Sequence, residues 1–91
     1  MAIVYIPTAL RLFTDGTSEI SLDGENVSKV IDNLVLQFAD LKTHLFTNEG
    51  KLRSFVNIYI NEEDIRHLDG LDTKIKDEDK ILLVPSIAGG I

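Results

Sequence analysis

The N-terminal part of the chain carries two patterns that are typical of β-strands, a short apolar run and an alternation of apolar and polar residues. Residues 2–7 (AIVYIP) form a short run of β-branched and aromatic residues that a proline ends, which is typical of a strand. Residues 14–17 (TDGT) carry a turn signal, and in residues 18–22 (SEISL) Ile20 and Leu22 alternate with polar neighbours. These segments predict a hairpin with a long connection.

The pattern changes to a helical period after residue 26. Asn26 is a plausible N-cap, and apolar residues then recur at the spacing of one helical face. Val35 and Leu36 widen this apolar stripe, so we expect the flanks of the helix to be partly covered. The predicted face consists of Val27, Val30, Ile31, Leu34, Phe38 and Leu41.

The second half of the chain returns to strand patterns. Residues 54–61 (SFVNIYIN) predict a strand, and residues 80–84 (KILLV) predict a last strand that a proline closes. Between them we expect an acidic turn, a short edge strand at residues 65–68 and a short helical turn at residues 71–75. In the first of these strands, Val56, Ile58 and Ile60 share one face and Phe55, Asn57 and Tyr59 the other.

This order of elements predicts an α+β fold with a mixed sheet of four to five strands and one helix across one face. The first and last strands are expected to lie side by side in the middle, which is the β-grasp (ubiquitin-like) arrangement. An all-β barrel would leave the helix without a role, and a split βαβ sandwich needs a second full helix. We expect a β-grasp domain at residues 1–85 and a flexible C-terminal tail at residues 86–91.

The predicted central strands are apolar at nearly every position, as in strands that are buried on both faces. A single helix covers only one face, so the other face should expose apolar surface, to which Phe55 and Tyr59 contribute. An exposed apolar patch on a small domain indicates a partner. Self-association, or cover by residues 8–13, would explain the pattern equally well.

Composition limits the chemistry that the chain can perform. Nine basic and fifteen acidic residues give a net charge of −6, which disfavours nucleic-acid binding. The absence of cysteine excludes disulfides, thiolate metal sites and a catalytic thiol. His44 and His67 lack the spacing of metal ligands, and no catalytic constellation is recognisable. No signal peptide or membrane-spanning run is present, so we expect a cytoplasmic protein that binds no membrane.

The last six residues, SIAGGI, come after the proline that closes the final strand and should project from the domain. Gly89 and Gly90 lack side chains, so a narrow tunnel in another protein could admit them. The carboxyl group at the end of such a tail is the only reactive group that it offers to a partner enzyme. A frayed end of small residues is the alternative interpretation.

Four segments give the chain a resemblance to the ubiquitin-like sulfur carriers of the ThiS/MoaD superfamily. Within that superfamily it is most similar to the CysO-type carriers of cysteine biosynthesis, along nearly its whole length. The most specific part of the resemblance is FVNIYINEEDIR, and the shared tail motif alone is weak. The segments are IPTALR (6–11), KLRSFVNIYINEEDIR (51–66), GL (70–71) and VPSIAGG (84–90).

The resemblance implies a carrier and co-substrate rather than an enzyme, with no cofactor of its own. An E1-like activating enzyme would use ATP to adenylate the carboxyl group of Gly90, and sulfur would then convert it to a thiocarboxylate. Ala88, Gly89 and Gly90 would insert into the partner. A PLP-dependent cysteine synthase would receive the sulfur, and a JAMM-type metalloprotease would release the product. Ile91 departs from the family pattern, so activation of Gly90 requires that Ile91 first be removed. The alternatives are that Ile91 is an incidental extension, or that this copy is inactive as a carrier.

Three other functions fit the same sequence. The chain could be the small subunit of molybdopterin synthase, which donates sulfur to a pterin precursor. It could be a ubiquitin-like modifier that becomes linked to other proteins. It could also be a non-covalent β-grasp adaptor whose tail is never activated. The fold alone does not separate these functions.

Overall fold

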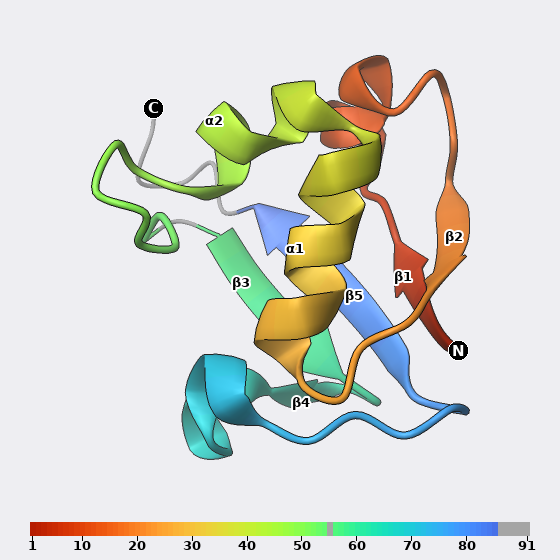
Figure 1. The fold of residues 1–91 in the computed structure, drawn as a ribbon, viewed down its shortest axis with the longest axis vertical. Helices are drawn as coiled ribbons and strands as arrows, with labels where there is room; N and C mark the ends of the chain where they lie inside the picture. Colours follow the sequence, from red (N-terminus) through yellow and green to blue (C-terminus); the bar gives the residue numbers. More distant parts are fainter. Residues whose placement is uncertain (55, 86–91) are drawn as a thin grey trace.

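A computed structural model describes residues 1–54 and 56–85 and places five strands in one mixed sheet with the order β2-β1-β5-β3-β4 (Figure 1). The first and last strands lie side by side at the centre and run parallel, and the other neighbours are antiparallel. The predicted β-grasp arrangement is therefore confirmed. The strands are β1 (Ala2–Tyr5), β2 (Glu19–Leu22), β3 (Val56–Ile60), β4 (Glu63–Asp64) and β5 (Lys80–Pro85).

The helix α1 (Val27–Gln37) lies across one face of this sheet, as the helical period predicts (Figure 1). Asn26 caps it, because its side-chain oxygen accepts a hydrogen bond of 2.9 Å from the backbone N–H of Lys29. The strand faces also agree with the pattern, since Val56, Ile58 and Ile60 are buried and alternate with half-buried neighbours. Local sequence therefore sets both the start of the helix and the inward face of β3.

The predicted helix is wrong beyond residue 37. Phe38 leaves the helical conformation with φ −127° and ψ 82°, and a 3-10 turn (Ala39–Leu41) and the short helix α2 (Lys42–Leu45) come next. This change of direction lets Leu41 and Leu45 enter the core. No glycine or proline marks the break in the sequence. The expected cover over the helix flank is also wrong for Leu36, which is 81% exposed.

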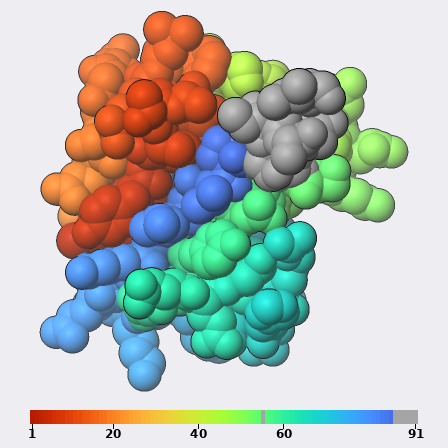
Figure 2. All heavy atoms as spheres, turned by 180° about the vertical axis from the view of Figure 1, so that it is seen from behind, coloured from red at the N-terminus to blue at the C-terminus, as the bar shows by residue number. Residues whose placement is uncertain are grey.

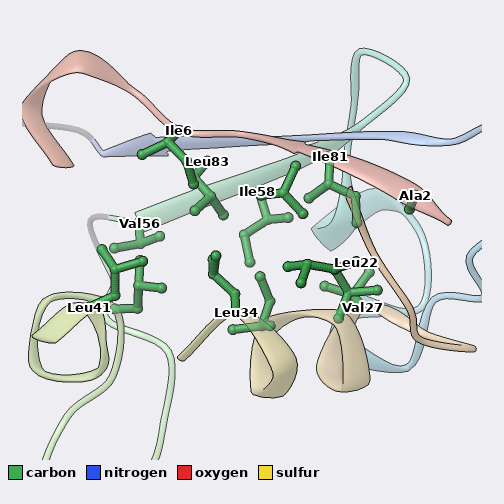
Figure 3. Packing of buried hydrophobic residues seen from close by; sticks show 14 of the residues in the cluster. Ala2, Ile6, Leu22, Val27, Leu34, Leu41, Val56, Ile58, Ile81 and Leu83 are labelled. Carbon is green, nitrogen blue, oxygen red and sulfur yellow. The ribbon is translucent and has the colours of Figure 1, made fainter. Parts of the chain in front are cut away.

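One cluster of apolar side chains fills the space between α1 and the sheet. Figure 3 shows side chains of β1, β3 and β5 pointing toward those of α1 and of the turn before α2. Burial of this apolar area is the main favourable term in folding. The cluster contains Ala2, Val4, Ile6, Leu10, Leu22, Val27, Val30, Ile31, Leu34, Leu41, Leu45, Val56, Ile58, Ile60, Ile65, Ile81 and Leu83.

Three short segments between the main elements differ from their predictions. Residues 8–13, expected as a loop, form a 3-10 helix (Thr8–Phe13) that places Leu10 in the core. The expected edge strand at residues 65–68 is instead a 3-10 turn (Ile65–His67), and the edge strand is β4 just before it. Asp64 explains the difference, because its carboxylate accepts a hydrogen bond from the backbone N–H of Arg66 and caps the turn. The predicted helical turn at 71–75 lies slightly earlier, at Gly70–Asp72.

Gly24 lies where the chain from β2 approaches the first turns of α1, and replacing it should destabilise the fold. A Cβ atom at this position would lie 2.6 Å from the backbone nitrogen of Val30 and 2.5 Å from its Cγ2. We expect Gly24→Ala to lower the free energy of unfolding by about 2 kcal/mol in urea titrations. Gly16→Ala is the control, because Gly16 has φ +80° but open space around it. Equal losses in the two variants would contradict the proposed steric contact.

Candidate functional site

The sheet face opposite α1 carries an exposed apolar strip along its central strands. Leu82 of β5 is paired with Tyr5 of β1 on one side and with Tyr59 of β3 on the other. Leu82 and Val84 are 41% and 37% exposed, although they belong to the central strand. Figure 2 looks onto this face, where β5 runs between β1 and β3. The four residues Tyr5, Tyr59, Leu82 and Val84 are called the open face below.

Three hollows meet at Leu82. One groove, of about 560 Å³, lies between the open face and the 3-10 helix Thr8–Phe13, and Arg11 is the charged residue in its lining. A second hollow, of about 580 Å³, includes Tyr5, Glu62 and Lys80, and a third, of about 280 Å³, includes Tyr59 and Glu62. Residues 8–13 therefore border the open face but leave Leu82 exposed. The expectation of exposed apolar surface on this face is confirmed for the part of the chain that the structure describes.

A hydrogen-bonded ion pair borders the open face at the edge of the sheet. The Arg66 guanidinium donates to Asp64 through Nη2 at 2.6 Å and through Nε at 3.1 Å, and Nη2 also donates to Asn57 Oδ1 at 2.8 Å. These hydrogen bonds from Arg66 favour the charged carboxylate and lower the pKa of Asp64 to about 2. Asp64 is the last residue of the acidic run at residues 62–64. Its ion pair with Arg66, two residues later, follows neither the helical nor the strand period, so the sequence pattern did not predict it.

The sequence-predicted site residues fall into two groups. Tyr59 lies on the open face, whereas Phe55 and the tail residues Ala88, Gly89, Gly90 and Ile91 lie outside the described residues. The described chain reaches Pro85, which pairs with Val56 at the end of β5 and lines the groove next to Arg11. The tail therefore begins at the edge of the open face.

The described residues offer little chemistry of their own. Within residues 1–54 and 56–85, no group of His, Cys, Asp and Glu side chains is arranged to hold a metal ion. His44 stacks against Phe13 with ring centroids 3.9 Å apart, and His67 is exposed at the end of its 3-10 turn. No helix in the described part of the chain could cross a membrane, since none is long and apolar enough. What this part offers is the exposed apolar strip of the open face, beside the point where the described chain ends at Pro85.

Comparison with protein families decides which family the chain belongs to. The sequence profile of the ThiS family matches residues 4–90, which span the described domain and the tail as far as Gly90. The chain is a member of the ThiS family. The match ends at the residue that the sequence analysis identified as the reactive position and leaves out Ile91.

Relatives of this ThiS family member include carriers and modifiers. It is 40% identical over 89 residues to the sulfur carrier protein CysO of Mycobacterium tuberculosis, and the alignment covers 96% of each chain. It resembles CysO in the solved BexX/CysO complex of Amycolatopsis orientalis, with a TM-score of 0.89 and 38% identity, and the match covers 99% of this chain and 100% of the other. It also resembles small archaeal modifier protein 1 of Methanosarcina acetivorans, with a TM-score of 0.86 and 36% identity, and this match covers 98% of this chain and 95% of the other. These names describe carrier and modifier proteins rather than enzymes.

The Asp64–Arg66 pair should make stability depend on pH. Because the pKa of Asp64 falls from 3.8 to about 2 on folding, its stabilising contribution is complete above the unfolded value and is lost as the pH falls towards 2. We expect Asp64→Asn to lower the urea midpoint at neutral pH, and the difference from the wild type to shrink on acidification. Glu63→Gln, at the exposed neighbouring position, is the control. A difference that stays constant with pH would contradict this assignment.

Proposed function

We propose that this protein is a sulfur carrier whose Gly90 carboxyl group is adenylated and converted to a thiocarboxylate that supplies sulfur for cysteine biosynthesis. The observation that carries the proposal is the ThiS family match, which runs through the domain and ends at Gly90. Identity of 40% to a sulfur carrier protein over 96% of both chains supports it. The carrier needs no catalytic side chain, because the reactive group belongs to the backbone.

The position of β5 suits such a role. Strand β5 pairs with β1 over residues 80–82 and with β3 over residues 81–85, so Pro85, the last residue before the tail, is fixed relative to the open face. A partner that docks on the open face would find the tail at a constant position. Docking of this kind converts a reaction between two free molecules into one between positioned groups.

The proposed chemistry assigns each reaction to a partner enzyme. An E1-like activating enzyme joins the Gly90 carboxylate to the adenylyl group of ATP and releases pyrophosphate. A sulfide-level sulfur donor then displaces AMP and leaves a thiocarboxylate. In a PLP-dependent cysteine synthase, the thiocarboxylate sulfur takes the place of the phosphate of O-phosphoserine, which leaves Gly90 in a thioester with the new cysteine. An S-to-N acyl shift turns this thioester into an amide, and a JAMM-type metalloprotease hydrolyses the amide after Gly90 to release cysteine. The solved BexX/CysO complex supports the expectation that a relative of this carrier docks on another protein.

The Gly90–Ile91 peptide bond must be cut before this chemistry can begin, because it blocks the carboxyl group of Gly90. We propose that a protease removes Ile91. The JAMM-type enzyme is the natural candidate, since the bond to be cut again joins Gly90 to one further residue.

A second candidate function is protein modification. Relatives with this role in their names include small archaeal modifier protein 3 of Haloferax volcanii, which is 31% identical over 68 residues and aligns with 75% of this chain and 73% of its own. In this case the activated Gly90 carboxyl group would be transferred to a lysine of a target protein. Conjugates that disappear when lysine side chains are blocked would favour this role over sulfur transfer.

Adenylation should require a free Gly90 carboxyl group. We expect the chain ending at Gly90 to support ATP–pyrophosphate exchange by the E1-like activating enzyme of the same organism, and the chain that retains Ile91 to support none. Gly89→Val in the trimmed chain should also abolish exchange, because a β-branched side chain would not enter a narrow tunnel. Exchange by the chain that retains Ile91 would contradict the need for trimming. Lack of exchange by both chains would favour the adaptor function.

The open face should contribute to binding of the activating enzyme. We expect Leu82→Glu to weaken binding about tenfold or more, because it places a charge in the middle of an apolar contact. Leu36→Glu is the matched control, since Leu36 is an exposed leucine on α1, on the other side of the sheet. Isothermal titration of both variants checks this prediction. Equal binding by the two variants would place the contact elsewhere.

A further inference from the structure

The turn between β3 and β4 contains a glutamate in a conformation that favours glycine. Tyr59 pairs with Asp64 and Ile60 with Glu63, so Asn61 and Glu62 form a two-residue hairpin loop. Their φ angles are 50° and 77°. Hairpin turns with both central residues at positive φ prefer Asn-Gly or Asp-Gly, so Glu62 stands where glycine would be the least strained residue.

The local structure explains Asn61 but not Glu62. The Asn61 side chain donates to Asp79 Oδ1 at 2.8 Å and accepts from the backbone N–H of Lys80 at 3.0 Å, which ties the turn to β5. The hydrogen bonds and ion pairs found among the described residues include none to the Glu62 side chain, which is exposed. Residues held in strained backbone conformations cluster at functional positions, so the conformation of Glu62 makes it a candidate for one.

Glu62 lies beside the open face and lines two of the three hollows that meet at Leu82. Arg11 lines the third, on the other side of Leu82, and its Nε donates to the Ile6 carbonyl at 3.0 Å. Arg11 forms no ion pair with any described residue. Lys80 lines one hollow together with Glu62 but is not paired with it in the described part of the chain. The apolar strip is therefore bordered by Arg11 at one end and by Glu62 together with Lys80 at the other, so its acidic group lies at one end alone.

We propose that Glu62 is a specificity residue for the partner that docks on the open face. The occupant is the E1-like activating enzyme, so this inference rests on the proposed function. Its docking surface would bring a basic side chain to Glu62, an apolar side chain onto Leu82 and a carboxylate to Arg11. Because Glu62 is the one acidic residue among the described linings of the three hollows, a basic partner side chain is attracted to one end of the strip alone, which favours one orientation over the reverse one. In the favoured orientation, the tail beyond Pro85 enters the enzyme from a defined side.

The test separates strain from recognition by measuring stability and affinity on the same full-length variants. Glu62→Gly removes both the strain and the charge, so its melting temperature should rise by roughly 4 °C while its affinity for the purified activating enzyme falls about tenfold. Glu62→Gln keeps the strain and removes the charge, so it should lose affinity with no change in melting temperature. Asp15→Gly is the control, because Asp15 also has a positive φ, 54°, and lines none of the three hollows.

Each result decides between the alternatives. A more stable Glu62→Gly variant with weakened binding supports the proposal, and full affinity in Asp15→Gly confirms that relaxing a turn does not itself weaken binding. Wild-type affinity in both Glu62 variants, or a less stable Glu62→Gly variant, overturns it. If the trimmed wild-type chain is not adenylated at all, the proposed function fails and this inference fails with it. Adenylation of the wild type together with unchanged binding by the Glu62 variants rejects this inference alone.

Discussion

The parallel pairing of β1 with β5 is the constraint on which the rest of the structure depends. It places the two most apolar strands side by side in the centre of the sheet, with Val4 opposite Ile81 and Tyr5 opposite Leu82. A single helix covers only one face of that pair, so Ile81 and Leu83 are buried while Leu82 and Val84 remain exposed. The same pairing fixes the end of β5, where the tail begins. The core and the open face thus arise from alternate residues of one strand.

Periodicity predicted the parts of the fold that depend on apolar alternation or on a cap. The inward face of β3 and the N-cap at Asn26 depend on residues close in sequence. The central pair joins strands from the two ends of the chain, and it was predictable because both strands are apolar at nearly every position. The break after Gln37 could not be predicted, because Phe38 continues the helical period and only tertiary packing favours the turn. The turn at Ile65 has a local cause instead, because Asp64 caps it, but apolar alternation does not reveal such a cap.

The candidate site was predictable in outline and not in its charged residues. An apolar strand with one covered face indicates an open face, and a glycine pair indicates an end that a tunnel can accept. Arg11 and Glu62 come from segments far apart in sequence and meet around Leu82 only in the folded chain. The strain at Glu62 is a property of the two-residue loop, which depends on the pairing register of β3 and β4.

The most direct test of the account is the intact mass of the protein isolated from its own host under sulfur limitation. We predict a chain that ends at Gly90, in which one sulfur has replaced one oxygen and which reacts once with an alkylating reagent. Because the chain has no cysteine, that reaction would identify a thiocarboxylate and would distinguish it from oxidation of the one methionine. A mass that retains Ile91, with no added sulfur and no reaction with the reagent, would contradict the sulfur-carrier function.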